Sequence, residues 1–281
     1  MRYKIKKFFL LFLVHTFLIS VAISCIFPFL WMINSSFKSN SEFISDYGFK
    51  FPHKIMWKNY FIAFCQGKMG IYFLNSLIYT FVSVIGIVVI SSLAGYSLSR
   101  LQFRGKNFIF FLFLAAMMIP TPAGFVPLYV LLKAVGLLNT RVGYCLAMVN
   151  VGLSLSIYLY KTFFDKLPRD LEDAARIDGC NRLRIWWHVI LPLARPATAV
   201  VVIFNALNVW NEFVLALVIF SNRNLMPLQV GLKEFASSSV GLTNYTVLMA
   251  GLTIASLPII IIYLMMQKHI IKGITAGALV G

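Results

Sequence analysis

The sequence predicts an all-α membrane protein with six transmembrane helices. Of its 281 residues, 60% are hydrophobic and 12% are charged, a balance that excludes ordinary soluble domains. Six apolar stretches are each long enough to cross a bilayer, which takes about 20 mostly apolar residues in a helix. Alternating apolar and polar strands are absent, and a chain in lipid must pair its own backbone groups, so helices are favoured over a barrel. The expected spans are 8–33, 72–97, 108–132, 142–160, 197–220 and 246–267 of a single domain, 1–281.

The distribution of basic residues predicts the orientation of these spans. The net charge is +16, and a cytoplasmic N-terminus would place 16 of the 25 Lys and Arg residues on the cytoplasmic side. Short loops rich in Lys and Arg stay inside the cell. We therefore expect both termini in the cytoplasm, and we interpret the basic surplus as a signal of topology. It adds a weak attraction to membrane lipid headgroups and does not indicate nucleic acid as a partner.

The third expected span contains three prolines. Pro120, Pro122 and Pro127 lie within 108–132, and each removes a backbone donor and clashes with the preceding turn. A break of this kind is tolerated in a membrane only where protein or a cavity covers the freed backbone. We therefore expect this span to be kinked or broken and to lie in the protein interior.

The loop after the fourth span, 161–196, begins with a predicted short acidic helix. Pro168 suits a first helical turn, and Asp170, Glu172 and Asp173 then lie near the positive end of the helix dipole. Gly179 fits a left-handed C-terminal cap.

A second short helix is expected over about 182–190. Asn181 is a good residue to begin it, and Leu191-Pro192 should end it. The loop is thus predicted to form two short helices with a sharp turn, outside the bilayer. Its first helix has a small, slightly apolar face that another surface can approach closely; the alternative is a solvated loop with local ion pairs. The face consists of Leu171, Ala174, Ala175 and Asp178.

The fifth span carries polar residues on one side. At about 100° per residue, Asn205, Asn208 and Glu212 fall within roughly 60° of one another. An ionisable group in a span usually faces protein or a wet cavity and marks a functional site. One hypothesis is that this stripe lines a translocation path, with Trp210 or Asn211 nearby. The alternative is that it makes interhelical hydrogen bonds that only hold the bundle together.

Motifs for enzyme chemistry are missing from the sequence. It has no phosphate-binding G-x-x-x-x-G-K-[ST] motif, and its four histidines have no metal-ligand spacing. We expect no catalytic residues, no metal site and no cofactor in this chain.

The segment "EDAARIDGC" followed by "ILP" resembles the cytoplasmic EAA loop of permease subunits in binding-protein-dependent ABC importers, which have the MetI-like transmembrane fold. The stretches "YSLSRLQFRGK", "MIPTPAGFVPLYVLLKAVGLLNT" and "GITAGALVG" are similar to the MalG-type branch, which serves carbohydrate uptake. The chain departs from the pattern at Asp173, where the family has glutamate, and at Val280, where the tail usually ends on a basic residue.

The resemblance implies that the loop is a coupling helix that docks in a cleft of an ATPase subunit. The residues implied in coupling are Glu172, Asp173, Ala174, Ala175, Asp178, Gly179, Leu191 and Pro192. The tail 268–281 is also implied to reach the ATPase, through Gly273, Thr275, Ala276 and Gly277.

The implied function is import of a sugar or oligosaccharide across a prokaryotic cytoplasmic membrane. The implied partners are a second, MalF-like permease, two MalK-like ATPase subunits that bind ATP and Mg, and an extracytoplasmic solute-binding protein. Three alternatives remain at this point: a permease of the same class for a non-sugar solute such as a glycerophosphodiester or polyol, a self-sufficient secondary transporter, and a membrane enzyme.

Overall fold

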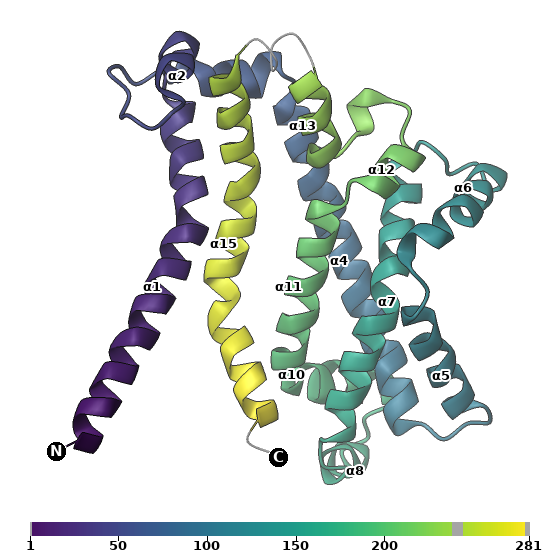
Figure 1. The fold of residues 1–281 in the computed structure, drawn as a ribbon. Coiled ribbons are helices and arrows are strands. Elements are labelled where there is room, and N and C mark those ends of the chain that lie inside the picture. Colours follow the sequence, from purple (N-terminus) through teal and green to yellow (C-terminus); the bar gives the residue numbers. More distant parts are fainter. Residues whose placement is uncertain (1, 238–243, 279–281) are drawn as a thin grey trace. The chain divides into compact units, whose positions relative to one another are not determined.

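The computed structural model describes residues 2–237 and 244–278, and every regular element in these ranges is a helix (Figure 1). This confirms the predicted all-α class. Four helices are long and apolar enough to cross a membrane, and two bent helix pairs raise the number to six if each pair is one span. The chain forms two compact units: Met1–Gly70 with Leu232–Ser256, and Ile71–Gly231 with Leu257–Gly281. They are called the first and the second unit below.

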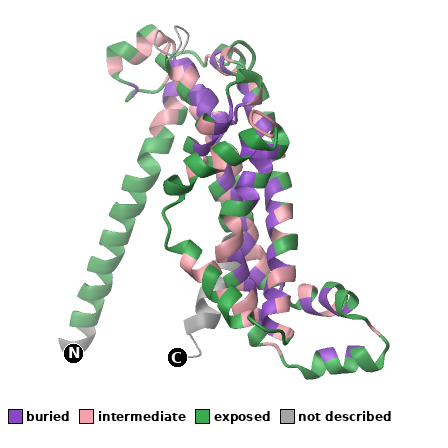
Figure 2. Cartoon of the chain, turned by 90° about the vertical axis from the view of Figure 1, so that its right-hand side faces the viewer, coloured by how far each residue is buried: buried purple, intermediate pink, exposed green. Residues whose placement is uncertain are grey.

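The first unit begins with the long helix α1, Arg2–Ser36. Its apolar part, Lys6–Ser36, has no buried residue in its most hydrophobic stretch, and the helix is coloured as exposed along most of its length in Figure 2. A helix that is apolar and exposed all round suits a lipid environment.

The loop that follows α1 is tied together by polar contacts. It contains α2 (Asn40–Asp46), α3 (Lys58–Phe61) and the π-helix η1 (Ile62–Gln66). The Lys38 side chain is fully buried and its Nζ lies 2.6 Å from Asp46 Oδ2. Asn59 donates hydrogen bonds of 2.8 Å to the carbonyls of Ser36 and Lys38. The loop is therefore an ordered cap on the end of α1.

The third predicted span is broken, as the prolines indicated. Helix α4, Met69–Arg100, is followed by α5, Lys106–Met117, the short 3-10 helix η2, Thr121–Gly124, and α6, Phe125–Ala134. The chain bends by 106° between α5 and the η2–α6 segment. Pro120 precedes η2 with an extended ψ of 129°, so the helical hydrogen bonding stops there. The prediction that this span lies in the interior is wrong for this chain, because most side chains of α5 and α6 are exposed and Leu132 is the one buried residue of these two helices.

The fifth span differs from the expected single helix over 197–220. Helix α7 covers Arg141–Asp165 and is followed by a loop with the short helices α8 (Asp170–Ile177), α9 (Arg182–Ile185) and α10 (Leu191–Leu193). Helix α11 then runs over Arg195–Asn211. The backbone is extended at Glu212, with ψ of 126°, and a separate helix α12 covers Val214–Ile219. Apolar composition gave no sign of this break. The chain continues through η4 (Arg223–Leu225), α13 (Leu228–Ser237) and α15 (Tyr245–Ala278).

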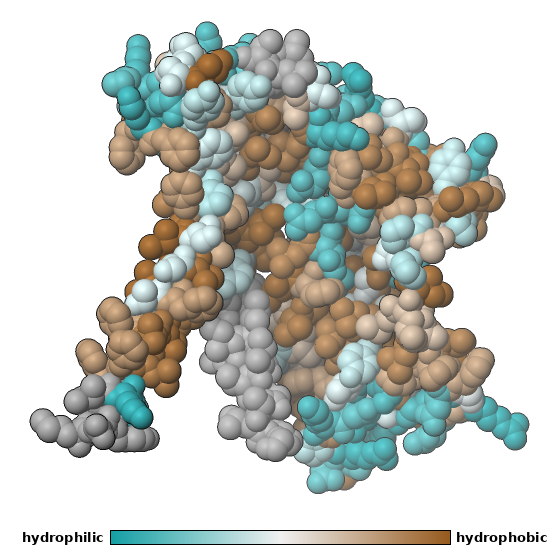
Figure 3. All heavy atoms as spheres, viewed as in Figure 1, coloured by the Kyte–Doolittle hydropathy of each residue, from teal (hydrophilic) through white to brown (hydrophobic). Residues whose placement is uncertain are grey.

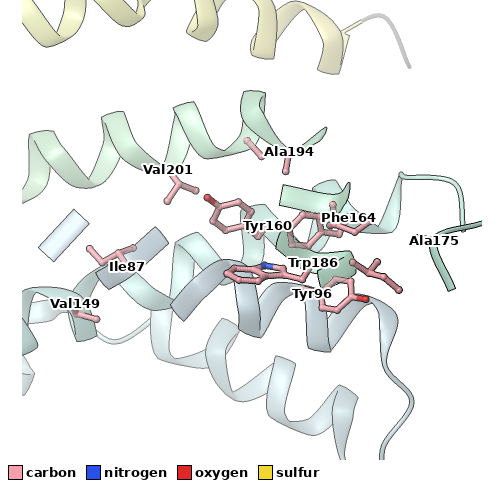
Figure 4. Close-up of a cluster of buried hydrophobic side chains, with 12 residues drawn as sticks. Ile87, Tyr96, Val149, Tyr160, Phe164, Ala175, Trp186, Ala194 and Val201 are labelled. Carbon is pink, nitrogen blue, oxygen red and sulfur yellow. The ribbon is translucent and has the colours of Figure 1, made fainter. Parts of the chain in front are cut away.

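A cluster of buried hydrophobic side chains in the second unit lies where α4 and α7 end and α11 begins. Fully buried Tyr160, Phe164 and Ile190 pack there with Tyr96 and Trp186 (Figure 4). The rings of Tyr160 and Phe164 stack with centroids 5.5 Å apart, and aromatic pairs of this kind contribute about 0.5–1.5 kcal/mol beyond their buried area. We call this end of the second unit the α8 end, because α8–α10 pack onto it. The opposite end is the α12 end.

We expect Lys38→Met to loosen the ordered loop of the first unit. The hydrogen bond from Lys38 holds the pKa of Asp46 below its ordinary value of 3.8. Because that folded-state pKa is depressed, the pair stabilises the loop above pH 3.8, and the stabilisation is lost as the pH falls through the lowered pKa. Chymotrypsin should therefore cut the variant faster after the exposed Phe49 at neutral pH. Lys58→Met, at an exposed lysine, is the control; equal cleavage of both variants would contradict the role of the pair.

Candidate functional site

The loop after α7 forms the two short helices that the sequence predicts. Helix α8 covers Asp170–Ile177 and has three acidic residues in its first turn. It begins two residues after Pro168, so this proline precedes the helix and does not enter its first turn. Gly179 has φ of +78°, the left-handed conformation expected of a C-terminal cap.

The second helix also has its predicted start. The side chain of Asn181 accepts a hydrogen bond of 2.9 Å from the Arg184 N–H, which caps α9, Arg182–Ile185. The π-helix η3, Trp186–Ile190, and α10, Leu191–Leu193, continue the chain toward α11. The two halves of the loop meet at Gly179, and the sharp turn is confirmed.

One face of α8 is buried against the rest of the second unit. Glu172 is 3% exposed, and its Oε1 forms an ion pair of 2.8 Å with Nε of Arg100 at the end of α4. The Tyr96 hydroxyl donates a hydrogen bond of 3.3 Å to the other carboxylate oxygen. Removing one partner of a buried ion pair typically costs about 3–5 kcal/mol, because the other charge is left unpaired. Glu172 therefore faces its own chain and is not on the surface that a partner would touch.

Further hydrogen bonds connect the neighbouring chain segments to α4. Arg100 Nη2 donates to the Leu167 carbonyl at 2.7 Å, just before α8. Ser99 donates to the carboxylate of Asp165, the last residue of α7, at 2.6 Å. Ala175, one turn from Glu172, is buried in the aromatic core. One side of the loop is thus packed onto the α8 end, as a docked loop requires. The other side is exposed and carries a local ion pair between Asp173 and Arg176, as the alternative of a solvated loop predicted.

The opposite face of the loop is exposed and partly apolar. The predicted face of small residues is divided by the structure, because Ala175 is buried whereas Leu171, Ala174 and Asp178 are exposed. The exposed fraction is 87% for Ile177 and 66% for Leu183. Exposed charged residues flank them in the sequence, namely Arg176, Asp178, Arg182 and Arg184. Figure 3 shows hydrophilic residues gathered at the α8 end of the second unit. We call the exposed residues Leu171, Ala174, Ile177, Asp178, Leu183 and Trp187 the outer face of the loop.

Other predicted coupling residues border this outer face. Asp173 is exposed and pairs with Arg176 at 3.0 Å on the same helix. Gly179 and Pro192 are exposed and Leu191 is half-buried. The sequence placed Leu183, Trp186, Trp187 and Ile190 on one side of the second helix, but Trp186 and Ile190 are buried whereas Leu183 and Trp187 are exposed. Sequence reasoning missed Ile177 as a surface residue and Arg100 as the partner of Glu172, and nothing local to the loop indicated Arg100.

The tail residues contribute no side-chain evidence. Helix α15 runs through Gly273, Thr275, Ala276 and Gly277, and their side chains lie outside the described part of the structure. Their predicted contact with an ATPase stays a prediction.

The polar stripe of α11 borders a cavity in the second unit. The cavity has a volume of about 750 Å³ and lies between the broken segment around η2, the middle of α7 and the end of α11. Asn205, Asn208 and Glu212 all line it, as do Ile119 and Pro120 at the break between α5 and α6. Glu212 is the one charged residue in the lining, which otherwise consists mainly of apolar side chains with a few amides and hydroxyls. The structure thus brings together three of the five predicted path residues.

The members of the stripe have different surroundings. Asn205 is 3% exposed and donates hydrogen bonds to Ser156 Oγ at 2.9 Å and to the Val201 carbonyl at 2.8 Å. It therefore holds α11 to α7, the role that the alternative hypothesis assigned to the whole stripe. Asn208 is exposed. One carboxylate oxygen of Glu212 accepts a hydrogen bond of 2.7 Å from the Leu215 N–H and so caps α12.

The remaining two residues do not line the cavity. Trp210 is 1% exposed, and its ring meets that of Phe73 edge to face at a centroid distance of 5.6 Å. Asn211 donates to the Leu207 carbonyl of its own helix. Within the described residues, no group of three His, Cys, Asp or Glu side chains is arranged to hold a metal ion.

Comparison with known proteins places these features in a family. The family model described as "binding-protein-dependent transport system inner membrane component" matches residues 86–276, which include both the loop and the cavity. The chain is 35% identical to the probable ABC transporter permease protein YurM of Bacillus subtilis, over 95% of this chain and 88% of that protein. It is 35% identical to the diacetylchitobiose uptake system permease protein NgcG of Streptomyces coelicolor, over 94% of this chain and 87% of that one.

A solved structure has the same fold. It is a chain of a bacterial ABC transporter involved in the import of the acidic polysaccharide alginate, with a TM-score of 0.82 and 27% sequence identity. The match covers 92% of this chain and 96% of that chain. A further relative, the arabinooligosaccharides transport system permease protein AraQ of Bacillus subtilis, is 31% identical over 94% of each chain.

Two glycines that line the same cavity should respond differently to substitution. A Cβ at Gly152 would collide with Asn205 Oδ1 and the Ile87 side chain, whereas a Cβ at Gly124 meets nothing within 4 Å. Overpacking of this kind costs about 1–3 kcal/mol. Gly152→Ala should therefore lower the melting temperature of the protein in detergent, and Gly124→Ala should leave it within a degree or so of wild type, where a few degrees correspond to about 1 kcal/mol. Equal melting temperatures would show that α7 and α11 are not packed this tightly.

Proposed function

We propose specific roles for the loop and the cavity, starting from the fact that the chain belongs to the family of binding-protein-dependent transport system inner membrane components. It is an integral membrane permease subunit of an ABC importer, of the kind that serves sugars and oligosaccharides. In our proposal it forms half of a translocation path for a sugar or oligosaccharide. The other half comes from a second, MalF-like permease.

The energy for transport comes, in this proposal, from two MalK-like ATPase subunits that bind ATP and Mg. This chain would contribute no ATP chemistry; it would transmit a movement. An extracytoplasmic solute-binding protein would deliver the solute on the opposite side of the membrane. The location is a prokaryotic cytoplasmic membrane with both termini inside, which puts the α8 end in the cytoplasm.

The main support for a role of the loop in coupling to the ATPase is the exposure of apolar side chains on its outer face. Ile177 and Leu183 are strongly exposed on short helices that are rigidly packed on their other side. Exposed apolar groups with a polar border are typical of protein interaction sites. Asp173 and Arg176 supply charges at this border. We propose that the ATPase docks on this face. Glu172 does not touch the ATPase in this proposal; it is buried and holds α8 to α4 through Arg100.

The cavity is the proposed site of contact with the solute. Sugars present many hydroxyl groups, and amide and carboxylate side chains in a largely apolar pocket can bind them in a defined orientation. Glu212 and Asn208 are the best placed of the predicted residues, because both line the cavity and, unlike Asn205, neither is buried. One oxygen of Glu212 is used by the Leu215 N–H, which leaves the second oxygen for a hydroxyl donor. Asn205 is assigned to structure, and Trp210 and Asn211 are not assigned to the path.

Ile177→Asp should weaken binding of the ATPase subunit. It replaces the most exposed apolar side chain of the outer face by a charge that would be buried in the docked complex. Replacing such a contact costs about 2 kcal/mol or more at the centre of an interface, so co-purification of the ATPase in mild detergent should drop at least tenfold. Ile55→Asp, at an exposed isoleucine of the first unit, is the control. Normal recovery of the ATPase with Ile177→Asp would reject the docking role of this face.

Glu212→Gln should impair uptake without unfolding the chain. The amide oxygen of glutamine can still accept the hydrogen bond from Leu215, so α12 keeps its cap while the charge in the cavity is lost. We expect at least a tenfold lower rate of sugar uptake in vesicles that hold normal amounts of assembled complex, since hydrogen bonds to a charged group contribute about 1.5–3 kcal/mol. Asn211→Ala, one residue away but outside the cavity lining, should transport normally. Normal uptake by assembled Glu212→Gln would remove Glu212 from the path.

A further inference from the structure

Glu212 lines the cavity and is half-buried, whereas Glu172 in the loop is more deeply enclosed. Its side chain is 4% exposed, and that of its partner Arg100 is 5% exposed. Both carboxylate oxygens are engaged: Oε1 faces Arg100, and Oε2 faces the Tyr96 hydroxyl, with Arg176 at 3.7 Å. Arg100 and Tyr96 both belong to α4. The carboxylate therefore connects α8 to a helix that is remote from it in sequence.

This connection adds a third attachment to the loop. Along the chain, α8 is joined only to α7 on one side and, through α9–α10, to α11 on the other. Besides apolar packing, three polar contacts join α4 to α8 and to the residues just before it. They are the contacts of Arg100 with Glu172 and with the Leu167 carbonyl, and the hydrogen bond from Tyr96 to Glu172. A buried ion pair contributes little net stability compared with apolar groups of the same size. The Arg100 Nε and Glu172 Oε1 atoms are close but do not have hydrogen-bond geometry. The directional contacts that fix one position of α8 on α4 are the hydrogen bonds from Tyr96 to Glu172 and from Arg100 to the Leu167 carbonyl.

Helix α4 extends from this pair to the α12 end. Its 32 residues span about 48 Å at a rise of 1.5 Å per residue. At the far end, Asn75 donates hydrogen bonds to the carbonyls of Asn224 and Met226, and Tyr79 donates one of 2.7 Å to the Leu225 carbonyl. Ser76 accepts from the Leu228 N–H at 2.8 Å. The helix is thus tied by side chains to the loop at one end and to the segment 224–228 at the other.

We propose that Glu172 and Arg100 are positioning residues that make α8 and α4 move as one body, so that a displacement of the loop is carried to segment 224–228. The pair does not touch the ATPase or the solute. It acts through the outer face on one side and through α4 on the other. This inference rests on the proposed docking of the ATPase on the outer face of the loop, and it adds the element to which the force is delivered.

The test compares uptake with ATP use in the full importer, reconstituted in liposomes with its second permease, its ATPases and its solute-binding protein. The variants are Glu172→Gln, Arg100→Gln, Arg100→Lys and the double variant Arg100→Gln with Glu172→Gln. The probes are ATP and the sugar that the wild-type complex imports, and the measured quantity is sugar imported per ATP hydrolysed. The amount of ATPase bound to each variant is measured in parallel.

We expect each glutamine variant to retain the ATPase and to import at least fivefold less sugar per ATP. The double variant should lose no more than the worse single variant, because the two residues act as one unit. Arg100→Lys, which keeps the charge, should recover part of the loss. A purely structural role would lower the amount of complex and leave the ratio for the remaining complex unchanged, and this result would overturn the proposal. Losses that multiply in the double variant would overturn it as well.

The docking of the ATPase on the outer face and the role of the Glu172–Arg100 pair are tested by different variants, so either can fail alone. If Ile177→Asp retains the ATPase, the proposed docking surface fails, whatever the glutamine variants do. If Ile177→Asp releases the ATPase while Glu172→Gln imports the normal amount of sugar per ATP, docking stands and the role of the ion pair is rejected.

Discussion

The structure depends on the requirement that backbone groups inside a membrane find partners within the protein. A continuous helix meets this requirement by itself, and an interrupted one meets it only where protein or a cavity covers the break. Two interruptions in the second unit, at Pro120 and at Glu212, border the same cavity. At the second break, the carboxylate of Glu212 accepts the hydrogen bond of the Leu215 N–H. The fold therefore concentrates its irregular backbone and its polar side chains around one cavity, and we place the path there.

At the α8 end, a short charged loop lies outside the spans and is attached to them by side-chain contacts. Tyr160, Phe164 and Trp186 supply apolar packing, and Glu172 enters this core with Arg100 as its partner. The loop consequently has an inner face that belongs to this subunit and an outer face that is available to another. A displacement of this loop by a partner on its outer face would therefore also displace α4, which contacts its inner face.

The sequence predicted the features that depend on local chemistry. Three prolines indicated the break in the third span, and Gly179 and Asn181 indicated the turn and the second helix of the loop. It did not predict the break at Glu212, because an apolar stretch with one acidic residue resembles a continuous span. Nor did it separate Glu172 from Asp173. Two adjacent acidic residues on a helix differ only in which one meets Arg100, and that is decided by the packing of α8 on α4.

The central claim is that the outer face of the loop is where a separate ATPase acts on this subunit. The most direct measurement places a photo-cross-linking residue at Ile177 in the assembled importer and identifies what it captures on illumination. The account predicts a covalent adduct with the ATPase subunit whose yield changes between the ATP-bound and nucleotide-free states. An adduct with lipid alone, or with the second permease alone, in both states would contradict it.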